Sequence, residues 1–198
     1  MKSFLFFSIV LLFSITGIGQ SKTSHGKWQL ELASGIHSFY APVQGLKISR
    51  PELTMYGGLH RLMGSKQNYG LGVQGGFAKN KLQGNAYFLQ VLAHFNATIA
   101  TKLETGVAVG AGYRIASYPS QSLAYNGDSW LKGQPVKGML QFPLQLNVGY
   151  KSIIIDRYDL IPFMAYQLQV LSGYSPGLSI LPVSSLSAGL KIKTFKNN

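Results

Sequence analysis

The chain has 198 residues, no cysteine, and a formal net charge of +12 that arises from 18 Lys and Arg residues against 6 Asp and Glu. The lack of cysteine excludes disulfides, thiolate metal sites and lipoprotein attachment, and the singly scattered basic residues argue against a nucleic-acid partner. Charged residues make up only 12% of the chain, whereas 23 glycines, 11 Phe and 11 Tyr fit a β protein with much apolar surface.

The first stretch, MKSFLFFSIVLLFSITGIGQ, is typical of a secretory signal peptide. Lys2 supplies the positive charge, residues 4–15 form an apolar segment, and Gly17 and Gly19 have the spacing that signal peptidase requires. The apolar segment is too short to cross a membrane as a helix, and no later segment has the roughly 18 consecutive apolar residues of a transmembrane helix. We therefore expect residues 1–19 to be cleaved and residues 20–198 to form one exported domain.

Eight segments alternate between apolar and polar side chains, which predicts eight β-strands. In LQFPLQLNVGY (residues 140–150), for example, the even positions are apolar or aromatic, while the odd positions are amides, proline and glycine. The segments exceed the roughly five or six residues of ordinary globular strands and suit tilted membrane strands. In chain order they cover residues 28–40, 51–63, 67–79, 85–99, 102–116, 138–150, 160–172 and 183–195.

The connections between these segments differ in length in a regular way. Those after the second and fourth segments are tight, whereas residues 41–50, 117–137 and 173–183 form long connections. Short turns at one end and long loops at the other are typical of outer-membrane barrels. The sequence therefore predicts an all-β fold, an eight-stranded antiparallel up-and-down transmembrane β-barrel.

The composition of the two strand faces predicts which one points inward. The apolar face carries almost no charge, with Arg61 as the exception, and the other face carries amides, glycines and few charges. A soluble barrel would need an exterior rich in Lys and Glu, whereas a small barrel has a lumen that polar side chains fill. We expect the apolar face to meet lipid, with girdles of aromatic residues at its two rims: Trp28, Tyr69, Phe95 and Tyr150 at one, and Tyr40, Phe77, Tyr87 and Tyr113 at the other.

These features together resemble the small eight-stranded outer-membrane proteins of Gram-negative bacteria. The "GxGxY" pattern of Gly110, Gly112 and Tyr113 and the expected mature start at Gln20 resemble such barrels from the Bacteroidetes. The resemblance covers nearly the whole mature chain and rests on pattern rather than on a specific motif. It implies the cell outer membrane as location, with outer-membrane lipid and lipopolysaccharide as surroundings.

The charged residues of the polar face predict a network inside the barrel. Glu31 and Lys191 lie on the first and last segments, which must be neighbours if the barrel closes. Buried charges need partners, so we expect these residues to plug and stabilise the lumen, with a polar conduction path as the alternative. The predicted lumenal charge network comprises Glu31, Glu104, Arg114, Lys191 and Lys193.

Two prolines raise an enzymatic alternative. Pro143 and Pro162 fall on the sixth and seventh segments, nearly opposite each other across one hairpin, and each removes a ladder hydrogen bond. They predict either two local bulges or a weakened seam, a feature that outer-membrane acyltransferases acting on lipid A use. His37, Asp128 and Ser129 are the candidates for acyl transfer, because a His–Asp–Ser set supports that chemistry, although no spacing signature links them.

The long connection 117–137 is the predicted contact surface, since loops on a rigid scaffold commonly carry binding and exposed aromatic side chains serve as anchors. Its candidate residues are Tyr118, Tyr125, Trp130, Lys132 and Lys137. The basic residues of the loops predict either a solvated rim or contact with lipopolysaccharide phosphates.

The sequence as a whole favours an outer-membrane protein with a structural, adhesive or envelope-accessory role. We expect no catalytic site, metal or cofactor, and an extracellular or envelope protein as a candidate partner. Two alternatives remain: an enzyme that acylates or deacylates lipid A, and a secreted soluble barrel that carries an apolar ligand.

Overall fold

The computed structural model describes most of the predicted mature chain. The described ranges are 27–38, 51–64, 67–81, 84–118, 123–125, 127–132, 135–151, 153–155, 158–175 and 178–194. The expected signal peptide, residues 1–19, lies outside them. Within these ranges we find no helix of the length and apolar character needed to cross a membrane.

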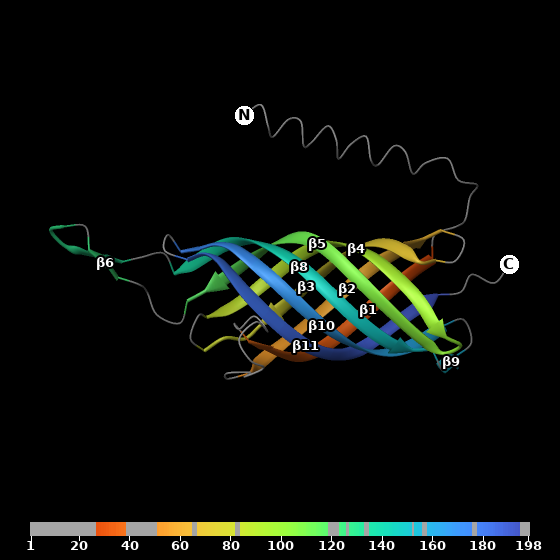
Figure 1. The fold of residues 1–198 in the computed structure, drawn as a ribbon. Coiled ribbons are helices and arrows are strands. Elements are labelled where there is room, and N and C mark those ends of the chain that lie inside the picture. Colours follow the sequence, from red (N-terminus) through yellow and green to blue (C-terminus); the bar gives the residue numbers. More distant parts are fainter. Residues whose placement is uncertain are drawn as a thin grey trace, which may run out of the picture.

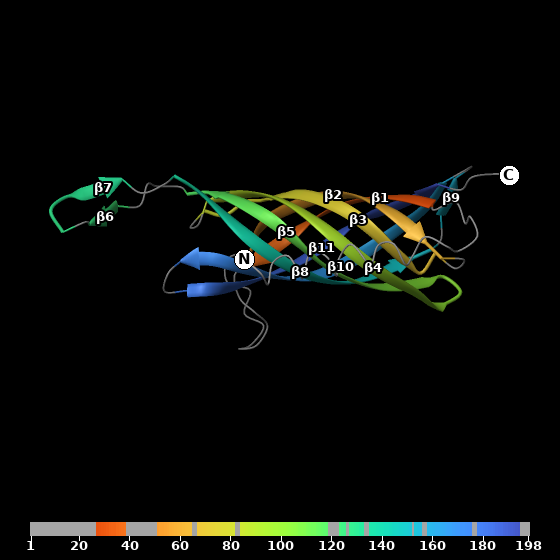
Figure 2. The same cartoon turned by 90° about the horizontal axis from the view of Figure 1, so that it is seen from above.

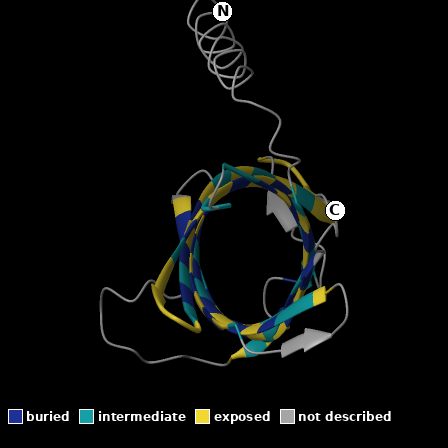
Figure 3. Cartoon of the chain, turned by 90° about the vertical axis from the view of Figure 1, so that its right-hand side faces the viewer, coloured by how far each residue is buried: buried dark blue, intermediate teal, exposed yellow. Residues whose placement is uncertain are grey.

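Eight long strands form a closed barrel, as the sequence predicts (Figure 1, Figure 3). Each strand pairs antiparallel with the next, and the last strand also pairs with the first, which leaves no free edge in the wall. The eight wall strands are β1 (Lys27–Ser38), β2 (Glu52–Met63), β3 (Tyr69–Ala78), β4 (Asn85–Ala100), β5 (Leu103–Ser117), β8 (Val136–Tyr150), β10 (Tyr158–Ser175) and β11 (Leu178–Thr194).

The two ends of the barrel differ. At one end, which we call the turn end, β2 joins β3 and β4 joins β5 through short turns, and β1 begins and β11 ends there. We call the opposite end the loop end. It carries the connection between β5 and β8, which is the longest between two consecutive wall strands.

Three short strands interrupt the connections and were not predicted. β6 (Leu123–Tyr125) pairs with β7 (Trp130–Lys132) in a small hairpin within the long loop, and β9 (Ile153–Ile155) pairs with the start of β10. The β6–β7 hairpin projects beyond the barrel wall (Figure 1, Figure 2). Strands of three residues are too short to show a periodic hydrophobic pattern.

The predicted long loop at residues 173–183 is wrong, because β10 and β11 extend much further than the sequence indicates. Ser175 pairs with Leu178, so the two strands are almost contiguous. The register shifts between Ser172 and Ser175, and Gly173 has a φ of 84°, which suits a bulge in a strand. The Gly, Pro and Ser content of this segment suggests a loop, but strand pairing reaches Ser175 on one side and Leu178 on the other.

The two prolines do not face each other, which corrects the predicted placement. Pro143 on β8 pairs with Gln169 on β10, whereas Pro162 on β10 pairs with Leu190 on β11. Pro162 also marks the place where the pairing of β10 with β8 stops, since that ladder begins at Phe163. The register of the closed barrel thus separates the two positions along the wall.

Pro143 does not create the bulge that the sequence suggested. The β5–β8 ladder lacks assigned pairs beside the proline, but the pairs on either side, Val109 with Leu144 and Gly112 with Gln141, keep the same register. No residue has been inserted. The proline therefore removes a hydrogen bond without displacing the strands.

The interior is polar and the exterior is apolar, which confirms the predicted assignment of faces. Along β8 every odd-numbered residue from Met139 to Gly149 is buried and every even-numbered one is exposed. Among the described residues, 21 buried side chains are polar or charged and 16 are hydrophobic, while large apolar side chains are exposed on every wall strand. Buried and exposed residues alternate around the barrel (Figure 3). This polarity is the reverse of that of a soluble barrel.

Glycines on the inner face make room for this filling. A Cβ at Gly72 would lie 2.0 Å from Nδ1 of His60, and a Cβ at Gly106 would lie 2.2 Å from Oδ1 of Asn96. Both distances are far shorter than van der Waals contact, so the lumenal side chains occupy space that only glycine leaves open.

Candidate functional site

An ionic cluster centred on Glu104 occupies the lumen near the turn end. The Glu104 carboxylate lies 2.7 Å from Nζ of Lys193, 3.0 Å from Nζ of Lys151 and 3.8 Å from Nζ of Lys191. Lys191 also donates a hydrogen bond of 2.6 Å to Oδ1 of Asn147. We define the ionic cluster as Glu104, Lys151, Lys191 and Lys193. Glu104 comes from the turn-end part of β5, Lys191 and Lys193 from that of β11, and Lys151 directly follows β8.

Glu31 anchors a second group of contacts further inside the lumen. Its Oε1 accepts hydrogen bonds from Gln74 at 3.4 Å and from Gln145 at 3.3 Å, and its Oε2 lies 3.6 Å from Nε2 of His60. Glu31 and Lys191 are direct register partners on β1 and β11. The barrel thus brings both acidic residues of the predicted network next to polar side chains.

A chain of glutamines fills the middle of the lumen. Gln141 donates to Oε1 of Gln90 at 2.6 Å, and Gln90 in turn donates to Oε1 of Gln74. These three side chains are at most 1% exposed. The rings of His60 and His94 pack edge to face with centroids 4.2 Å apart. Together with the ionic cluster, these groups form a largely polar filling that suits a plug.

Arg114 does not join the other four residues of the predicted network. It lies ten residues beyond Glu104 on β5, or roughly 30 Å along the strand at ~3.3 Å per residue. Its Nη1 donates a hydrogen bond of 3.3 Å to Oε1 of Gln169. The network is therefore divided between the two halves of the lumen.

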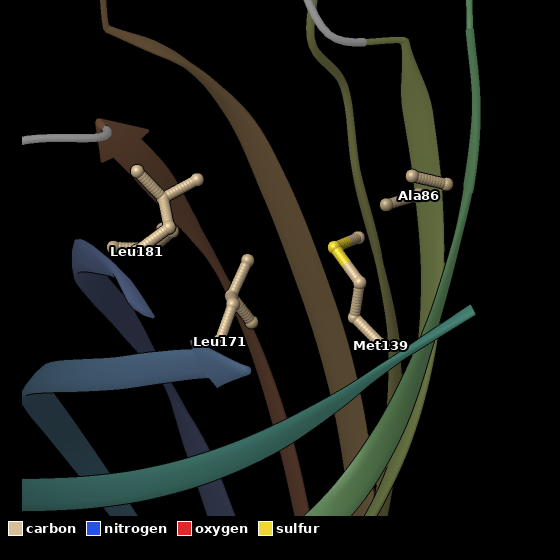
Figure 4. Close-up of a cluster of buried hydrophobic side chains, with 6 residues drawn as sticks. Ala86, Met139, Leu171 and Leu181 are labelled. Atoms are coloured by element: carbon tan, nitrogen blue, oxygen red, sulfur yellow. The ribbon is translucent and has the colours of Figure 1, made fainter. Parts of the chain in front are cut away.

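The loop half of the lumen contains an apolar layer that the sequence did not reveal. Met139 and Ala86 on one wall point toward Leu171 and Leu181 on the other (Figure 4). We call this layer the apolar collar; its residues are Ala86, Ala116, Met139, Leu171, Leu181 and Val183. The parity of Met139 and Leu171 along their strands could have placed them inside, whereas Leu181 lay in the wrongly predicted loop.

The three candidate catalytic residues are not brought together. His37 is buried in the lumen on β1, where its Nε2 donates to the carbonyl oxygen of Lys79 at 2.6 Å. Asp128 and Ser129 are exposed in the turn between β6 and β7, outside the barrel (Figure 2). The described residues therefore contain no assembled His–Asp–Ser arrangement.

The residues of the predicted contact surface lie at the loop end. Trp130 is 66% exposed and Lys132 is exposed, both on β7 of the hairpin, while Tyr118 and Lys137 are half-buried where the loop leaves and rejoins the wall. The backbone of Tyr125 pairs with Trp130, but its side chain lies outside the described residues.

Aromatic side chains lie at both rims of the outer wall. Tyr69 and Phe95 are adjacent near the turn end, with ring centroids 6.2 Å apart, and Phe77 and Tyr87 near the loop end are 5.2 Å apart. Tyr40, another expected member, lies outside the described residues. Across the described ranges, no group of three or more His, Cys, Asp or Glu side chains could hold a metal ion.

Comparisons with known proteins show the fold. No protein-family model and no curated protein sequence matches the chain. Neisserial surface protein A (NspA) matches it with a TM-score of 0.56 and 14% identity over 87% of this chain and 99% of that structure. The chain shares the eight-stranded barrel fold of that protein.

Two further solved structures are similar at lower scores. The N-terminal β-barrel domain of Pseudomonas aeruginosa OprF has a TM-score of 0.48 and 11% identity, covering 84% of this chain and 99% of its own. Ail of Yersinia pestis, in complex with the heparin analogue sucrose octasulfate, has a TM-score of 0.48 and 9% identity, covering 85% and 97%.

Proposed function

We propose that the protein is an integral outer-membrane β-barrel of the Gram-negative envelope, with a structural, adhesive or envelope-accessory role. Residues 1–19 direct export and are then cleaved, and residues 20–198 form the barrel. The observation that carries the proposal is the reversed polarity of the wall, in which polar side chains are buried and large apolar side chains are exposed on all eight strands.

The physical argument for a lipid environment has two parts. A monomeric soluble protein rarely exposes more than a few hundred Å² of continuous apolar surface, whereas here the apolar surface surrounds the barrel. A closed barrel also satisfies its backbone hydrogen bonds internally, as the bilayer core requires. A soluble carrier of an apolar ligand would need an apolar lumen, but amides fill the middle of this one and ion pairs lie near its turn end.

The loop end is the surface that we propose for contact outside the membrane. It carries the β6–β7 hairpin with the exposed Trp130 and Lys132, and exposed Lys79 and Lys81 at the wall. Lysines there can bind the phosphates of lipopolysaccharide, and the exposed Trp130 provides an anchor for an extracellular or envelope protein partner.

Cell fractionation combined with protease shaving tests this proposal. We expect the protein in the outer-membrane fraction, with gel migration that changes on heating, and cleavage within residues 117–137 on intact cells. The short turns after β2 and β4 should be cut only after the outer membrane is permeabilised. Recovery of the protein in a soluble fraction would reject the proposal, and cleavage of the turns on intact cells would reverse its orientation.

The lipid A-modifying alternative gains no support from the geometry, since His37 is separated from Asp128 and Ser129. We expect Ser129→Ala and His37→Ala to leave lipid A acylation unchanged, as measured by mass spectrometry of extracted lipid A. A loss of one acyl chain in either variant would restore the enzymatic alternative.

A further inference from the structure

Arg114 is a buried cation that the ionic cluster does not compensate. It is 3% exposed and lies on the inner face of β5, between its register partners Phe88 on β4 and Met139 on β8. Among the described residues its hydrogen bond is to the neutral amide of Gln169. Within the described ranges no carboxylate forms an ion pair with Arg114.

The two halves of the lumen therefore differ in charge balance. Near the turn end, Lys191 and Lys193 share the carboxylate of Glu104. In the loop half, the guanidinium of Arg114 has several N–H donors, and within the described part of the chain only the amide of Gln169 accepts a hydrogen bond from it. A buried charge without a counter-charge is costly, so an anion beside Arg114 would stabilise this part of the barrel.

The apolar collar lies directly on the loop side of Arg114. Ala116 follows Arg114 by two residues on the same inner face of β5, and Met139 on β8 is the register partner of Arg114. Leu171 follows Gln169 by two residues on β10 and has Leu181 as its register partner on β11. A molecule that reaches the guanidinium from the loop end must therefore pass hydrocarbon side chains from several strands (Figure 4).

We propose that the loop half of the lumen binds an amphipathic anion with a single alkyl chain. Its carboxylate or sulfate head pairs with the guanidinium of Arg114, whose planar fork of donors suits such groups, and its chain packs within the apolar collar. Met139 can adapt to the chain because methionine is flexible and unbranched. The site depends on the lumen rather than on the membrane, so it does not rest on the proposed outer-membrane location.

The methionines of the mature chain provide a direct assay. Met139 lies in the apolar collar, Met55 and Met164 are exposed on the outer wall, and Met63 lies at the turn end. The mature protein is labelled with 13C at the methionine methyl groups, refolded in decyl maltoside micelles and titrated with octyl sulfate, octyl glucoside or inorganic sulfate. Methyl spectra then report the lumen and the wall in one sample.

We expect octyl sulfate to shift the Met139 methyl resonance with saturation, and octyl glucoside and inorganic sulfate to leave it in place. Met55 and Met164 should respond equally to both octyl amphiphiles, because they contact the micelle. Equal Met139 responses to octyl sulfate and octyl glucoside would overturn the proposal. Saturation of the Met139 shift by inorganic sulfate at the same concentration would also overturn it, because the octyl chain would then contribute nothing to binding.

Variants at Arg114 test the role of the charge. Arg114→Gln should weaken octyl sulfate binding about tenfold or more, as expected for the loss of a charge-assisted pair, and Arg114→Lys should restore part of it. Arg61→Gln makes the same change on the outer wall and should have no effect, since Arg61 is exposed. Unchanged binding in Arg114→Gln would overturn the proposal.

A second readout covers the case in which Arg114→Gln does not fold. In the wild-type protein, the Nε–H resonance of Arg114 should shift during the octyl sulfate titration with the same midpoint as the Met139 methyl. An Arg114 resonance that does not move would overturn the proposal without any variant.

Discussion

The outer wall and the lumen of this barrel obey opposite rules of packing. On the wall, apolar side chains point away from the protein and need no specific partner, so a residue there is defined by its hydrophobicity and depth. In the lumen, Glu104 and Gln90 each bind particular neighbours, and a Cβ added at Gly72 would overlap the ring of His60. A substitution on the wall should therefore change the free energy of unfolding through the transfer of its side chain into lipid. A substitution in the lumen should change it through lost hydrogen-bond or ion-pair partners, or through steric overlap.

The largest effect is expected from removing the carboxylate of the ionic cluster. Glu104→Gln removes the carboxylate that lies 2.7 Å from Nζ of the buried Lys193, and removing one partner of a buried ion pair typically costs about 3–5 kcal/mol. The free energy of unfolding in urea, measured in lipid vesicles, would show this loss. Glu52→Gln at the loop-end rim is the matched control, because its carboxylate accepts hydrogen bonds from the exposed backbone N–H of Lys81. If the two variants lost equal stability, the lumenal ion pairs would not govern stability.

A charge on the wall should cost slightly less and depend on depth. Leu144 is exposed near the middle of β8, so Leu144→Arg should destabilise the folded barrel by about 2–4 kcal/mol in the same vesicles. Val136→Arg, on the same face at the start of β8, should cost about 0–1 kcal/mol. Equal costs at the two depths would contradict a bilayer around the wall.

Interrupting the glutamine chain should have an intermediate effect. Gln90→Leu removes both the donor to Gln74 and the acceptor for Gln141. Because losses within one hydrogen-bond network are not additive, we expect a combined cost of about 1–3 kcal/mol, which is typical of an unsatisfied buried polar group. Leu89→Gln, the neighbouring position on the wall, places an amide in lipid instead. Urea titration of the two variants separates the cost of a lost hydrogen-bond partner in the lumen from the cost of transferring an amide into lipid. Full stability in Gln90→Leu would show that the glutamine chain contributes nothing to the free energy of unfolding.

The smallest effects come from two glycines of β3 that lie on opposite faces. Gly72→Ala places a Cβ 2.0 Å from Nδ1 of His60, whereas Gly75→Ala on the wall meets nothing closer than Cδ1 of Leu89 at 3.5 Å. Overpacking predicts a cost of about 1–3 kcal/mol for Gly72→Ala, and Gly75→Ala should stay within about 0.5 kcal/mol of the wild type. The midpoints of heat-induced unfolding on gels should rank the two variants; the reverse order would contradict a filled lumen.

The sequence predicts the wall well because each strand position has only two possible directions. The alternation in residues 140–150 assigns every side chain to lipid or lumen, and the closure of the barrel makes Glu31 and Lys191 neighbours. The exception is residues 173–183. Their Gly, Pro and Ser content is typical of a loop, but β10 extends to Ser175 and β11 begins at Leu178.

The lumen is less predictable because its contacts depend on register around the whole barrel. Lys151 joins Glu104 although it lies just beyond β8; its odd number continues the inward parity of that strand, and this signal could have found it. The chain from Gln141 through Gln90 to Gln74 joins three strands, and its partners follow from side-chain rotamers that periodicity does not specify. The separation of Arg114 from the ionic cluster likewise depends on distance along β5.

A spin-label scan of β8 tests the reversed polarity most directly, since the chain has no native cysteine and single cysteines can be introduced at residues 140–149. In lipid vesicles, labels at even positions should be accessible to oxygen and inaccessible to a polar nickel reagent, while labels at odd positions should be inaccessible to both. The opposite pattern, with odd positions open to the nickel reagent and even positions protected from oxygen, would contradict the account.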